Sequence, residues 1–185
     1  MRVSETELPG VLLIEPAVFG DERGYFLETW AAARYPEGGI GVDFVQDNLS
    51  KSRAGTLRGL HLQHPHGQAK LVYVVVGEVF DVAVDVRVGS PTFGRWYGTV
   101  LSEANKRQLF IPAGFAHGFC VTSSEAIFAY KCSDGYHPEA ELTIAYDDPG
   151  IGVQWPTSTP TLSKKDTAGI RLRDVDPARL PSYSR

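Results

Sequence analysis

Apolar and polar residues alternate in short runs along most of the chain, and Gly, Pro, Asp and Asn separate these runs. The clearest run spans residues 79–88, where the Phe or Val residues at even positions fall on one face and mostly polar residues fall on the other. Alternation with a period of two is typical of a β-strand that buries one face. The strands predicted in this way are Val11–Glu15, Tyr25–Thr29, Val42–Asn48, Thr56–Gln63, Ala69–Val76, Val79–Val88, Arg95–Leu101, Gln108–Ile111, His117–Thr122, Ala126–Cys132 and Leu142–Tyr146.

The spacing of these strands indicates the fold class. Gly77 and Glu78 form a tight turn between residues 69–76 and 79–88, so we expect these two strands to pair as a hairpin. Many short strands at regular spacing are typical of a sandwich or barrel. A double-sheet jelly roll fits better than an open sandwich, and such a barrel has a mouth in which a small ligand can sit. The prediction is an all-β jelly roll, or double-stranded β-helix, with a few short helices.

Helix is scarce, and the end of the chain has few strand signals. We predict about two helical turns over residues 28–35, which Pro36 ends, and a short helix over residues 174–180. The segment after Asp147 is rich in Pro, Ser and Thr. We interpret the chain as one domain, residues 1–185, in which residues 147–185 form an ordered tail packed on the barrel. The apolar tail residues that need burial are Trp155, Leu162, Ile170 and Leu172.

The composition is that of an ordinary globular protein. The chain has 185 residues, 43% of them apolar, and its 22 acidic residues exceed its 18 Lys and Arg residues, which gives a formal charge of −4. The length fits one domain with a core that needs no metal or disulfide. A mild negative charge argues against nucleic acid as the main partner, because phosphate binding needs a concentrated basic face. It does not exclude a small anionic ligand.

The sequence contains no recognisable targeting or membrane segment. The residues after Met1 lack the apolar stretch of a signal peptide, and every apolar run is far shorter than the roughly 18–20 residues that span a bilayer. We therefore expect a cytoplasmic protein with no membrane partner. Cys120 and Cys132 lie in strand-like segments and do not make a disulfide framework, so we expect buried free thiols.

Several polar residues interrupt the apolar strands. Arg58 and His61 lie in the strand predicted over residues 56–63, and Lys70, His117 and Tyr130 lie in or beside other strands. Each is ordinary on its own, as a solvated cation, a satisfied histidine or a core aromatic residue. Buried polar groups are costly unless they are paired, so a cluster of them inside a barrel favours a ligand-binding site.

The centre of the chain resembles the two motifs of the cupin family. His64 and His66, with Lys70 four residues further on, resemble the first motif, and the sequence PAGFAH at residues 112–117 resembles the second. In metal-binding cupins these histidines and a Glu at the position of Lys70 hold the ion. A lysine there repels a divalent cation and removes an oxygen ligand, so we predict the fold without a metal. The alternative is a metal-dependent cupin oxygenase that uses His64, His66 and His117.

A longer, ordered set of motifs resembles the dTDP-4-dehydrorhamnose 3,5-epimerase family. The matching segments are residues 58–63, 68–72, 77–87, 89–94, 111–119 and 162–166, and the similarity runs from about Leu8 to Arg173. The resemblance implies a homodimeric jelly-roll enzyme that needs no metal or organic cofactor. It also implies the reaction, which is epimerisation of dTDP-4-keto-6-deoxy-D-glucose at C3 and C5 to dTDP-4-keto-L-rhamnose, in dTDP-L-rhamnose biosynthesis.

The chemistry of that reaction gives the catalytic residues their implied roles. C3 and C5 both adjoin the C4 ketone, so removal of either proton gives an enolate and needs a base, a stabiliser of the C4 oxygen and an acid on the other face. The resemblance makes His61 the base and Asp166 the partner that fixes its tautomer. It places Lys70 beside the C4 oxygen and makes Tyr130 the acid.

The resemblance also implies a set of substrate-binding residues. Arg23 and Arg58 match nucleotide-binding positions, where the forked donors of arginine suit a diphosphate, and Tyr136 matches the aromatic residue that stacks on thymine. The full set is Arg23, Glu28, Gln46, Asp47, Asn48, Arg58, His117, Tyr136, Glu141 and Lys165. Strict alternation places Arg58 and His61 on opposite faces. We expect either a β-bulge near Gly59 that brings both to one side or an Arg58 that serves the neighbouring subunit.

Three positions depart from the family pattern. Leu49 stands where a His is usual, Gly135 stands where an aromatic residue is usual, and residues 139–142 lack the usual His and Arg. We expect Gly135 to loosen the loop that carries Tyr136, which would change the carbon that is reprotonated. The alternatives are therefore a single-carbon (C3 or C5) epimerase or ketoisomerase of a nucleotide 4-ketosugar in an antibiotic-sugar pathway, another nucleotide carrier, and a catalytically silent sugar-binding cupin.

Overall fold

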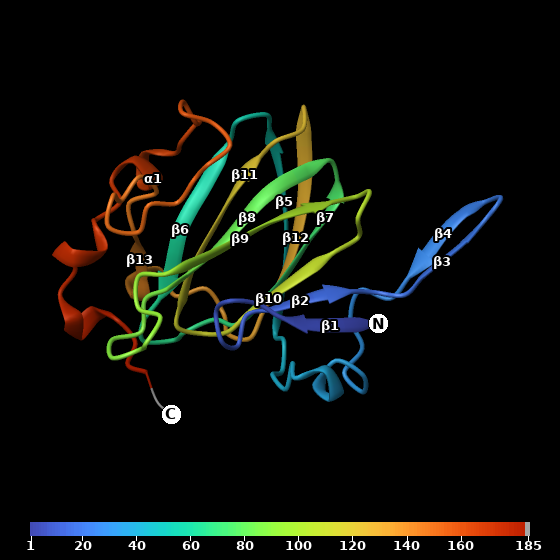
Figure 1. The fold of residues 1–185 in the computed structure, drawn as a ribbon, viewed down its shortest axis with the longest axis horizontal. Coiled ribbons are helices and arrows are strands. Elements are labelled where there is room, and N and C mark those ends of the chain that lie inside the picture. The colour runs from blue at the N-terminus through green and yellow to red at the C-terminus, as the bar shows by residue number, and fades with distance from the viewer. Residues whose placement is uncertain (184–185) are drawn as a thin grey trace.

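The computed structural model describes residues 1–183 and consists mainly of two antiparallel sheets (Figure 1). The six-stranded sheet contains, in spatial order, β1 (Arg2–Glu5), β2 (Leu12–Glu15), β10 (Gln108–Ile111), β7 (Lys70–Val76), β12 (Glu125–Cys132) and β5 (Gln46–Arg53). The five-stranded sheet contains β13 (Glu141–Thr143), β6 (Leu57–Gln63), β11 (Phe115–Val121), β8 (Glu78–Asp85) and β9 (Trp96–Ser102). The predicted all-β jelly-roll class is confirmed.

The remaining elements are short. A two-stranded hairpin of β3 (Val18–Asp21) and β4 (Gly24–Leu27) projects from the body of the molecule (Figure 1). The helical elements are η1 (Pro36–Gly38), η2 (Pro138–Ala140), α1 (Lys164–Thr167), η3 (Leu172–Asp174) and η4 (Pro177–Arg179). Within the described residues, no helix is long and apolar enough to cross a bilayer.

The predicted hairpin of residues 69–76 and 79–88 is wrong. β7 pairs with β10 and β12, whereas β8 pairs with β9 and β11, so the turn at Gly77 carries the chain from one sheet to the other. Gly77 has a φ of +79°, and a Cβ there would lie 2.0 Å from the carbonyl oxygen of Glu125. The turn residues therefore mark a chain reversal correctly. They carry no information on which strands then form the hydrogen bonds.

Two predicted helices and several strand limits also differ from the structure. Residues 28–35 form turns instead of a helix, and Pro36 begins η1 instead of ending a helix, because Tyr35 is drawn fully into a cluster with Trp30. Residues 174–180 are divided between η3 and η4, and Pro177 begins the second. β5 runs over residues 46–53, not 42–48, and β1 and β3 were not predicted. β1, β3 and β5 have largely exposed faces, so they lack the apolar alternation that identifies a half-buried strand.

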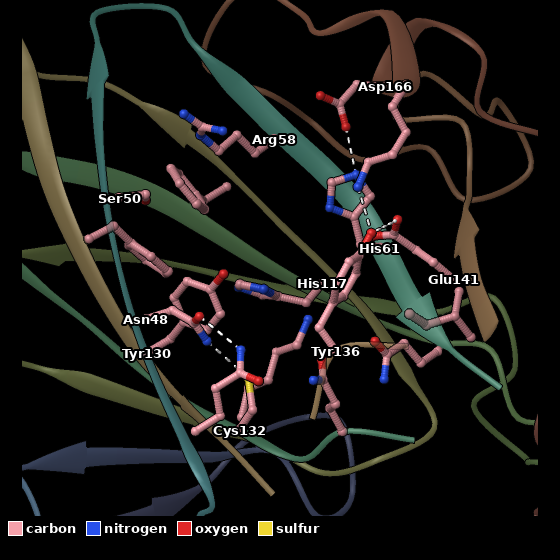
Figure 2. Close-up of a pocket in the computed structure, with 18 of the residues that line it drawn as sticks. Asn48, Ser50, Arg58, His61, His117, Tyr130, Cys132, Tyr136, Glu141 and Asp166 are labelled. Carbon is pink, nitrogen blue, oxygen red and sulfur yellow. Dashed lines mark hydrogen bonds and ion pairs between the residues drawn. The ribbon is translucent and has the colours of Figure 1, made fainter. Parts of the chain in front are cut away.

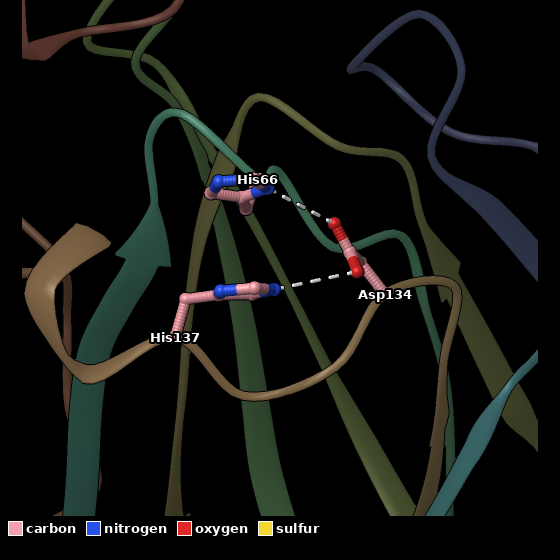
Figure 3. A group of neighbouring side chains, drawn as sticks. All are labelled: His66, Asp134 and His137. Carbon is pink, nitrogen blue, oxygen red and sulfur yellow. Dashed lines mark ion pairs between the residues drawn. The ribbon is translucent and has the colours of Figure 1, made fainter.

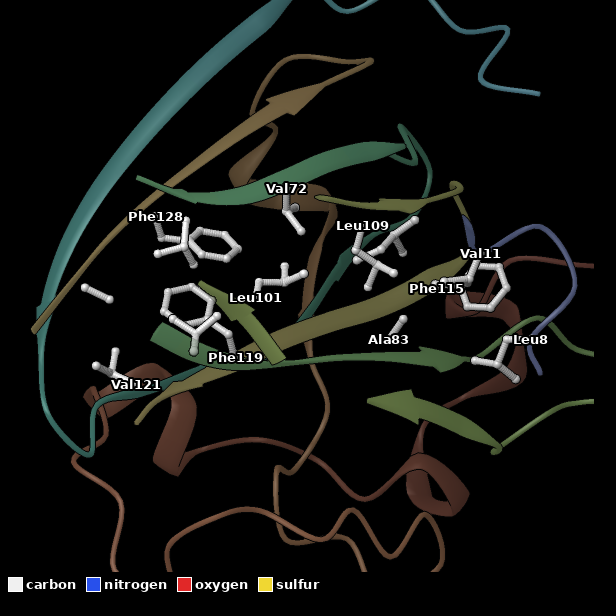
Figure 4. Close-up of a cluster of buried hydrophobic side chains, with 14 residues drawn as sticks. Leu8, Val11, Val72, Ala83, Leu101, Leu109, Phe115, Phe119, Val121 and Phe128 are labelled. Atoms are coloured by element: carbon white, nitrogen blue, oxygen red, sulfur yellow. The ribbon is translucent and has the colours of Figure 1, made fainter. Parts of the chain in front are cut away.

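The two faces of β8 contact two different hydrophobic clusters. Val79 and Ala83 lie in the core between the sheets, together with Val72, Leu109 and Phe128 of the opposite sheet (Figure 4). These side chains fill one part of the space between the two sheets, and polar side chains line the remaining part. Full burial of each such side chain contributes about 1.5–3 kcal/mol of transfer free energy.

The outer face of the five-stranded sheet is covered by the C-terminal segment. Val82, Val84 and Val86 pack there with Leu172, Val175 and Leu180, and Trp155 packs against the same cluster. Of the tail residues expected to need burial, Leu172 is buried, but Ile170 is 39% exposed, which corrects that expectation. Cys120 and Cys132 are buried free thiols, as predicted.

Candidate active site

A cavity of about 410 Å³ lies between the two sheets, and polar side chains from both sheets and from α1 surround it (Figure 2). Its size falls in the range of about 300–1,000 Å³ that is usual for small-molecule sites. The predicted site residues that line it are Gln46, Asn48, Arg58, His61, Lys70, His117, Tyr130, Tyr136, Glu141, Lys165 and Asp166. Residues far apart in the sequence therefore converge on one pocket.

His61 and Asp166 form a close pair on one wall of the pocket. The Nε2 atom of His61 lies 2.7 Å from Oδ1 of Asp166. A carboxylate can only accept a hydrogen bond, so Nε2 carries the proton and Nδ1 keeps its lone pair. Burial lowers the pKa of His61 and outweighs the opposite effect of the Asp166 hydrogen bond, while the positive charges of Lys165 and Lys70 lower it further. The imidazole is therefore neutral at neutral pH and ready to accept a proton.

The short helix α1 fixes Asp166 in place. Ser163 is the N-cap residue: its hydroxyl accepts from the Asp166 amide at 3.2 Å and its own amide donates to Oδ2 of Asp166 at 3.3 Å, which makes a reciprocal capping box. The Ser163 hydroxyl also donates to Oδ2 at 2.6 Å. The amide of Gly59 donates to Oδ1 at 3.2 Å. Burial by itself would raise the pKa of Asp166, but the hydrogen bonds from His61, Ser163 and Gly59 outweigh it and lower the pKa to about 2. The carboxylate thus stays ionised beside His61.

A β-bulge in β6 brings Arg58 and His61 to the same cavity. His117 pairs with His61 and Phe119 pairs with Arg58, so a step of two residues along β11 matches a step of three along β6. Gly59 supplies the extra residue with a φ of +130°, and a Cβ there would lie 2.5 Å from Cα of Gly118. The bulge expected near Gly59 is confirmed. It removes the need to assign Arg58 to another subunit.

Lys70 and Tyr130 face this wall from the six-stranded sheet, at the start of β7 and in the second half of β12. Burial lowers the pKa of Lys70, and among the described residues no carboxylate lies within 4.0 Å of its ammonium group. Burial raises the pKa of Tyr130, so its hydroxyl stays protonated at neutral pH. Figure 2 shows the Tyr130 ring and the His61 imidazole extending into the cavity from different strands.

A second His–Asp pair lies deeper in the pocket. Nε2 of His117 lies 2.9 Å from Oδ2 of Asp81, and both residues are buried. The pair spans β11 and β8 of the same sheet, so Asp81 is a polar residue on the inward face of an otherwise apolar strand. With Nε2 held by a carboxylate, Nδ1 of His117 is the nitrogen left for the cavity.

The exposed rim of the pocket is built around Tyr136. Its hydroxyl donates to Oε2 of Glu141 at 3.0 Å, and Nζ of Lys165 donates to Oε1 of the same carboxylate at 2.7 Å. Burial by itself would raise the pKa of Glu141, but the hydrogen bonds from Lys165 and Tyr136 outweigh it and keep that pKa below its usual value. Tyr136 is 56% exposed, so one face of its ring is open to a flat ligand group.

The backbone of Gly135 is firmly held, which argues against a loosened Tyr136 loop. Its carbonyl accepts from Gln63 at 3.1 Å and from Gln68 at 2.9 Å, and its amide donates to Asp134 at 2.7 Å. A Cβ at this position would meet nothing within 4 Å. The glycine is thus not required by space, and its neighbours fix the loop that carries Tyr136.

Three predicted binding residues lie outside this pocket. Arg23 is on the projecting hairpin, where it pairs with Asp21 beside a separate surface hollow. Glu28 pairs with Arg34, and Asp47 forms an ion pair with Lys131 at 2.8 Å. A single chain therefore brings together most, but not all, of the predicted binding residues. The three that lie outside the pocket are Arg23, Glu28 and Asp47.

The structure does not assemble the metal site of metal-binding cupins. His117 lines the pocket and is bonded to Asp81, whereas His64 and His66 lie outside the pocket in the turn before β7. Lys70, which stands at the position of the metal-binding Glu of other cupins, lines the pocket with an ammonium group instead of a carboxylate. The donor set of the alternative oxygenase is therefore not brought together.

Sequence reasoning missed several pocket residues. One of them, Cys132, accepts a hydrogen bond from the predicted residue Asn48 at 3.7 Å. The predicted Arg58 is itself held by Ser52, to which it donates at 3.0 Å. The lining residues that were not predicted are Ser50, Leu62, Gln63, Gln68, Phe119, Phe128, Cys132 and Ser163. For Ser50, Phe119, Phe128 and Cys132, strand parity relative to Asn48, His117 and Tyr130 was a usable signal, because alternate residues of one strand share a face.

The fold and the pocket together define a class of protein. A jelly roll that holds a neutral histidine with its carboxylate, a half-buried lysine and a protonated tyrosine in one cavity is a cupin-type acid–base enzyme. The particular family follows from comparison. The sequence profile described as dTDP-4-dehydrorhamnose 3,5-epimerase matches residues 5–174. The chain belongs to the dTDP-4-dehydrorhamnose 3,5-epimerase family and is an isomerase.

Individual relatives agree with this assignment. The chain is 55% identical over 178 residues to dTDP-4-dehydrorhamnose 3,5-epimerase of Shigella flexneri. The alignment covers 95% of this chain and 98% of that protein. It is 41% identical to a dTDP-4-dehydrorhamnose 3-epimerase of Streptomyces niveus, over 100% of this chain and 90% of the other. It superposes with a TM-score of 0.97 and 53% identity on a dTDP-6-deoxy-D-glucose-3,5-epimerase of Legionella pneumophila Philadelphia 1 solved with dTDP-4-keto-L-rhamnose, covering 100% and 99% of the two chains.

Proposed function

We propose that this chain converts dTDP-4-keto-6-deoxy-D-glucose into dTDP-4-keto-L-rhamnose by epimerisation at C3 and C5. The observation that carries the proposal is the pocket between the sheets, where the His61–Asp166 pair and Lys70 line the same cavity as Tyr130. The higher identity to a 3,5-epimerase than to a 3-epimerase, 55% against 41%, supports reaction at both carbons.

The first step is removal of the proton beside the ketone. Nδ1 of neutral His61 takes the proton from C3 or C5, and the ionised carboxylate of Asp166 stabilises the imidazolium that forms. The low pKa of Asp166 matters here, because a protonated partner would supply no negative charge. The C–H bond breaks and its electron pair passes to the C4 oxygen as an enolate.

Lys70 stabilises that enolate. Burial makes its charged form costly in the free enzyme, and no carboxylate in the described chain is paired with it. A developing negative charge at the C4 oxygen supplies the missing counter-charge, so the attraction is stronger in the transition state than in the ground state. The lysine thus takes the role that a metal ion has in other cupins.

Tyr130 completes the inversion. Its protonated hydroxyl, on the sheet opposite His61, donates a proton to the other face of the enolate carbon. His61 then releases its proton to solvent and Tyr130 takes one up from solvent, which restores both groups. The same groups then act on the second carbon after the sugar has turned in the pocket. The reaction is neutral overall and requires no cofactor.

The outer part of the pocket binds the nucleotide. Arg58 and Lys165 supply positive charge for the diphosphate, and Tyr136 offers a ring face for stacking on thymine. Gln46, Asn48, His117 and Glu141 add polar contacts from the wall. Asp47 does not line the pocket in this chain, where its exposed carboxylate pairs with Lys131.

We propose that the active assembly is a homodimer in which the β3–β4 hairpin of one protomer reaches the pocket of its partner. The hairpin projects from the body and exposes Phe19, Tyr25 and Phe26, which are 66%, 57% and 69% accessible. Exposed apolar patches of this kind mark interaction surfaces. Arg23 and Glu28 lie on or just after this hairpin, so pairing would bring them to a site that their own chain does not reach.

We further propose that the chain acts as a single cytoplasmic domain, residues 1–185, with residues 147–185 as its packed tail. The C-terminal segment contributes Asp166 to the pocket and Leu172, Val175 and Leu180 to the outer cluster, which supports one cooperative unit. Neither a membrane nor a nucleic acid is expected as a partner.

The proposal is tested by incubating the protein with dTDP-4-keto-6-deoxyglucose in D₂O with a chelator present, followed by proton NMR. Loss of both the C3 and C5 proton signals is the expected result. Loss at C3 alone would instead identify a 3-epimerase like the Streptomyces niveus relative. In that case the next residues to examine would be Leu49 and Gly135, which depart from the family pattern. No exchange at either carbon would contradict the proposed substrate.

A further inference from the structure

Three potential metal ligands meet outside the catalytic pocket, where two loops come together. His66 lies in the turn between β6 and β7, and Asp134 and His137 lie in the loop between β12 and η2 (Figure 3). One ligand atom of each lies within 4.8 Å of the others. We propose that these three side chains bind a divalent transition-metal ion such as Zn²⁺, at a site separate from the catalytic groups.

The distances suit a shared ion better than direct contacts. Nδ1 of His66 lies 3.7 Å from Oδ2 of Asp134, and Nε2 of His137 lies 3.6 Å from Oδ1 of Asp134. Both distances exceed a normal hydrogen bond. Two ligands that bind one tetrahedral ion at about 2.0–2.1 Å lie about 3.3–3.4 Å apart. The two His–Asp134 distances are therefore a few tenths of an ångström too long for a shared ion, and the two imidazole nitrogens, which lie within 4.8 Å of each other, would also have to approach.

The orientation of the rings agrees with this site. The imidazoles of His66 and His137 stack with centroids 4.0 Å apart and planes 12° apart. Figure 3 shows both rings presenting a nitrogen atom to the Asp134 carboxylate. The two nitrogens face different oxygens of one carboxylate, so the rings must tilt toward each other for both lone pairs to meet one ion, and a water molecule would supply the fourth ligand.

The groups around the cluster hold the ligands in that orientation. The other ring nitrogen of His137, Nδ1, lies 3.4 Å from Oε1 of Glu139, which is the usual place for a carboxylate behind a metal-bound histidine. The Asp134 side chain is oriented by the amide of Gly135, which donates to Oδ1 at 2.7 Å. The ligand side chains are between one third and one half exposed, so an ion has a route in.

The donor set selects the kind of metal. Two imidazole nitrogens and one carboxylate suit Zn²⁺, Ni²⁺ or Cu²⁺, whereas Mg²⁺ and Ca²⁺ prefer oxygen ligands. The cluster uses His66 of the cupin-like turn but not His64 or His117. The site therefore differs from that of metal-binding cupins in both its ligands and its place.

Gln63 connects this cluster to the pocket. Its side-chain amide donates to the carbonyl oxygens of His66 at 2.9 Å and Gly135 at 3.1 Å, and its oxygen accepts from the His137 amide at 2.9 Å. Gln63 itself lines the pocket, and so does Tyr136, which lies between Asp134 and His137 in the sequence. A bound ion would fasten the Tyr136 loop to the end of β6. Its expected effect on turnover, a lower KM with little change in kcat, rests on the proposed function.

The experiment measures metal binding directly and without substrate. Zn²⁺ is titrated into the full-length protein by isothermal titration calorimetry, and Co²⁺ is added separately to record the visible absorption of a tetrahedral complex. One Zn²⁺ per chain is expected, with no comparable heat from Mg²⁺. His137→Gln and Asp134→Asn should lose this binding, and Glu139→Gln should weaken it roughly tenfold. His64→Gln is the matched control, because it changes a histidine of the same turn that lies outside the cluster, and it should bind as the unchanged protein does.

The outcomes are decisive in either direction. Equal Zn²⁺ affinity in the unchanged protein, His137→Gln and Asp134→Asn would overturn the site, and so would binding that appears only at millimolar metal. Circular dichroism and thermal unfolding of each variant show whether it is folded before its binding is compared. Because no substrate is used, a failure here is separate from a failure of the proposed epimerase reaction.

Discussion

At the scale of single residues, the pocket assigns different protonation states to groups that lie within one cavity. Burial lowers the pKa of His61 and raises that of Tyr130, while hydrogen bonds bring the pKa of Asp166 to about 2. The result at neutral pH is a free base, a protonated acid and an ionised carboxylate. This is the set of states that proton removal on one face and proton return on the other require.

Replacing the base should abolish proton exchange. His61→Asn keeps a polar side chain next to Asp166 but removes the basic Nδ1 nitrogen, so kcat/KM should fall by about 10²–10⁴-fold. Solvent exchange at C3 and C5 in D₂O should fall in parallel, while dTDP binding stays within a small factor. His64→Asn, outside the pocket, is the control. Unchanged turnover in His61→Asn would show that another group is the base.

Removing the tyrosine hydroxyl should separate the two half-reactions. Tyr130→Phe keeps the ring in the wall but removes the acid, so hydrogen exchange with retention of configuration should continue while epimerised product is lost. Comparing deuterium incorporation with product formation by NMR measures this ratio. Tyr97→Phe, a partly buried tyrosine outside the pocket, serves as the control. Equal loss of exchange and epimerisation would count against Tyr130 as the acid.

The shifted pKa of His61 predicts a specific pH dependence. Its pKa lies below the ordinary value of 6.5, so the neutral base persists as the pH falls below that value and is lost only when the pH passes through the lowered pKa. An NMR titration of the His61 C–H signal should therefore give a midpoint below 6.5. Lys165→Gln removes a positive charge that lowers this pKa, so its midpoint should rise. A midpoint at or above 6.5 in the unchanged protein would contradict the environment described.

At the scale of elements, the site depends on an irregularity in one strand. β6 carries the bulge that turns both Arg58 and His61 to the cavity, and the same bulge lets the Gly59 amide reach Asp166. α1 then supplies Asp166 itself through the capping box with Ser163. A four-residue helix and one extra strand residue, neither of them stable alone, are positioned by contact with each other.

The bulge should not accept a side chain. Gly59→Ala would place a Cβ 2.5 Å from Gly118 in a backbone conformation that L-residues rarely adopt, so we expect a loss of about 2–3 kcal/mol in unfolding free energy. Activity should fall as well, because Arg58 and His61 move. Gly55→Ala is the matched control, since Gly55 also has a positive φ of +72° but open space around it. Urea unfolding of both variants measures the difference, and equal losses would show that close packing at Gly59 is unimportant.

At the scale of the whole molecule, the two sheets, the tail and the hairpin have different tasks. The sheets form the pocket walls, the tail covers the outer face of the five-stranded sheet and delivers Asp166, and the hairpin projects away from both. The family resemblance predicts that Arg23 binds nucleotide, yet Arg23 lies on or beside that hairpin. The proposed homodimer would account for this, because a second copy of the chain would give the exposed apolar hairpin a partner.

A mixture of a variant that binds substrate weakly and a variant without the base tests this arrangement, assayed at a substrate concentration below KM. Arg23→Ala should raise the KM for the nucleotide sugar about tenfold or more, which corresponds to one charged hydrogen-bonding group. When Arg23→Ala and His61→Asn chains are unfolded and refolded together, hybrid dimers should contain one intact site and regain activity. Sedimentation should give twice the mass of one chain. A monomeric mass, or no recovery in the mixture, would mean that Arg23 does not act across an interface.

Much of this protein could be predicted from the sequence, and the limits of that prediction have a clear origin. Alternation with a period of two identified most strands, and β10 was predicted with its observed limits, Gln108–Ile111. Ordered motifs gave the family and the residues His61, Lys70, Tyr130 and Asp166, all of which meet in one pocket. Local pattern is sufficient here because it records which side of a strand is buried.

Only the tertiary structure decided how these pieces combine. It placed β7 and β8 in different sheets and paired His117 with Asp81. It settled on a bulge at Gly59, and it left Arg23 outside the pocket of its own chain. Strand pairing and hydrogen-bond partners depend on contacts between residues far apart in the chain, and periodicity carries no record of them. The sequence by itself therefore determined the family and the candidate catalytic residues, and the fold determined which of them meet.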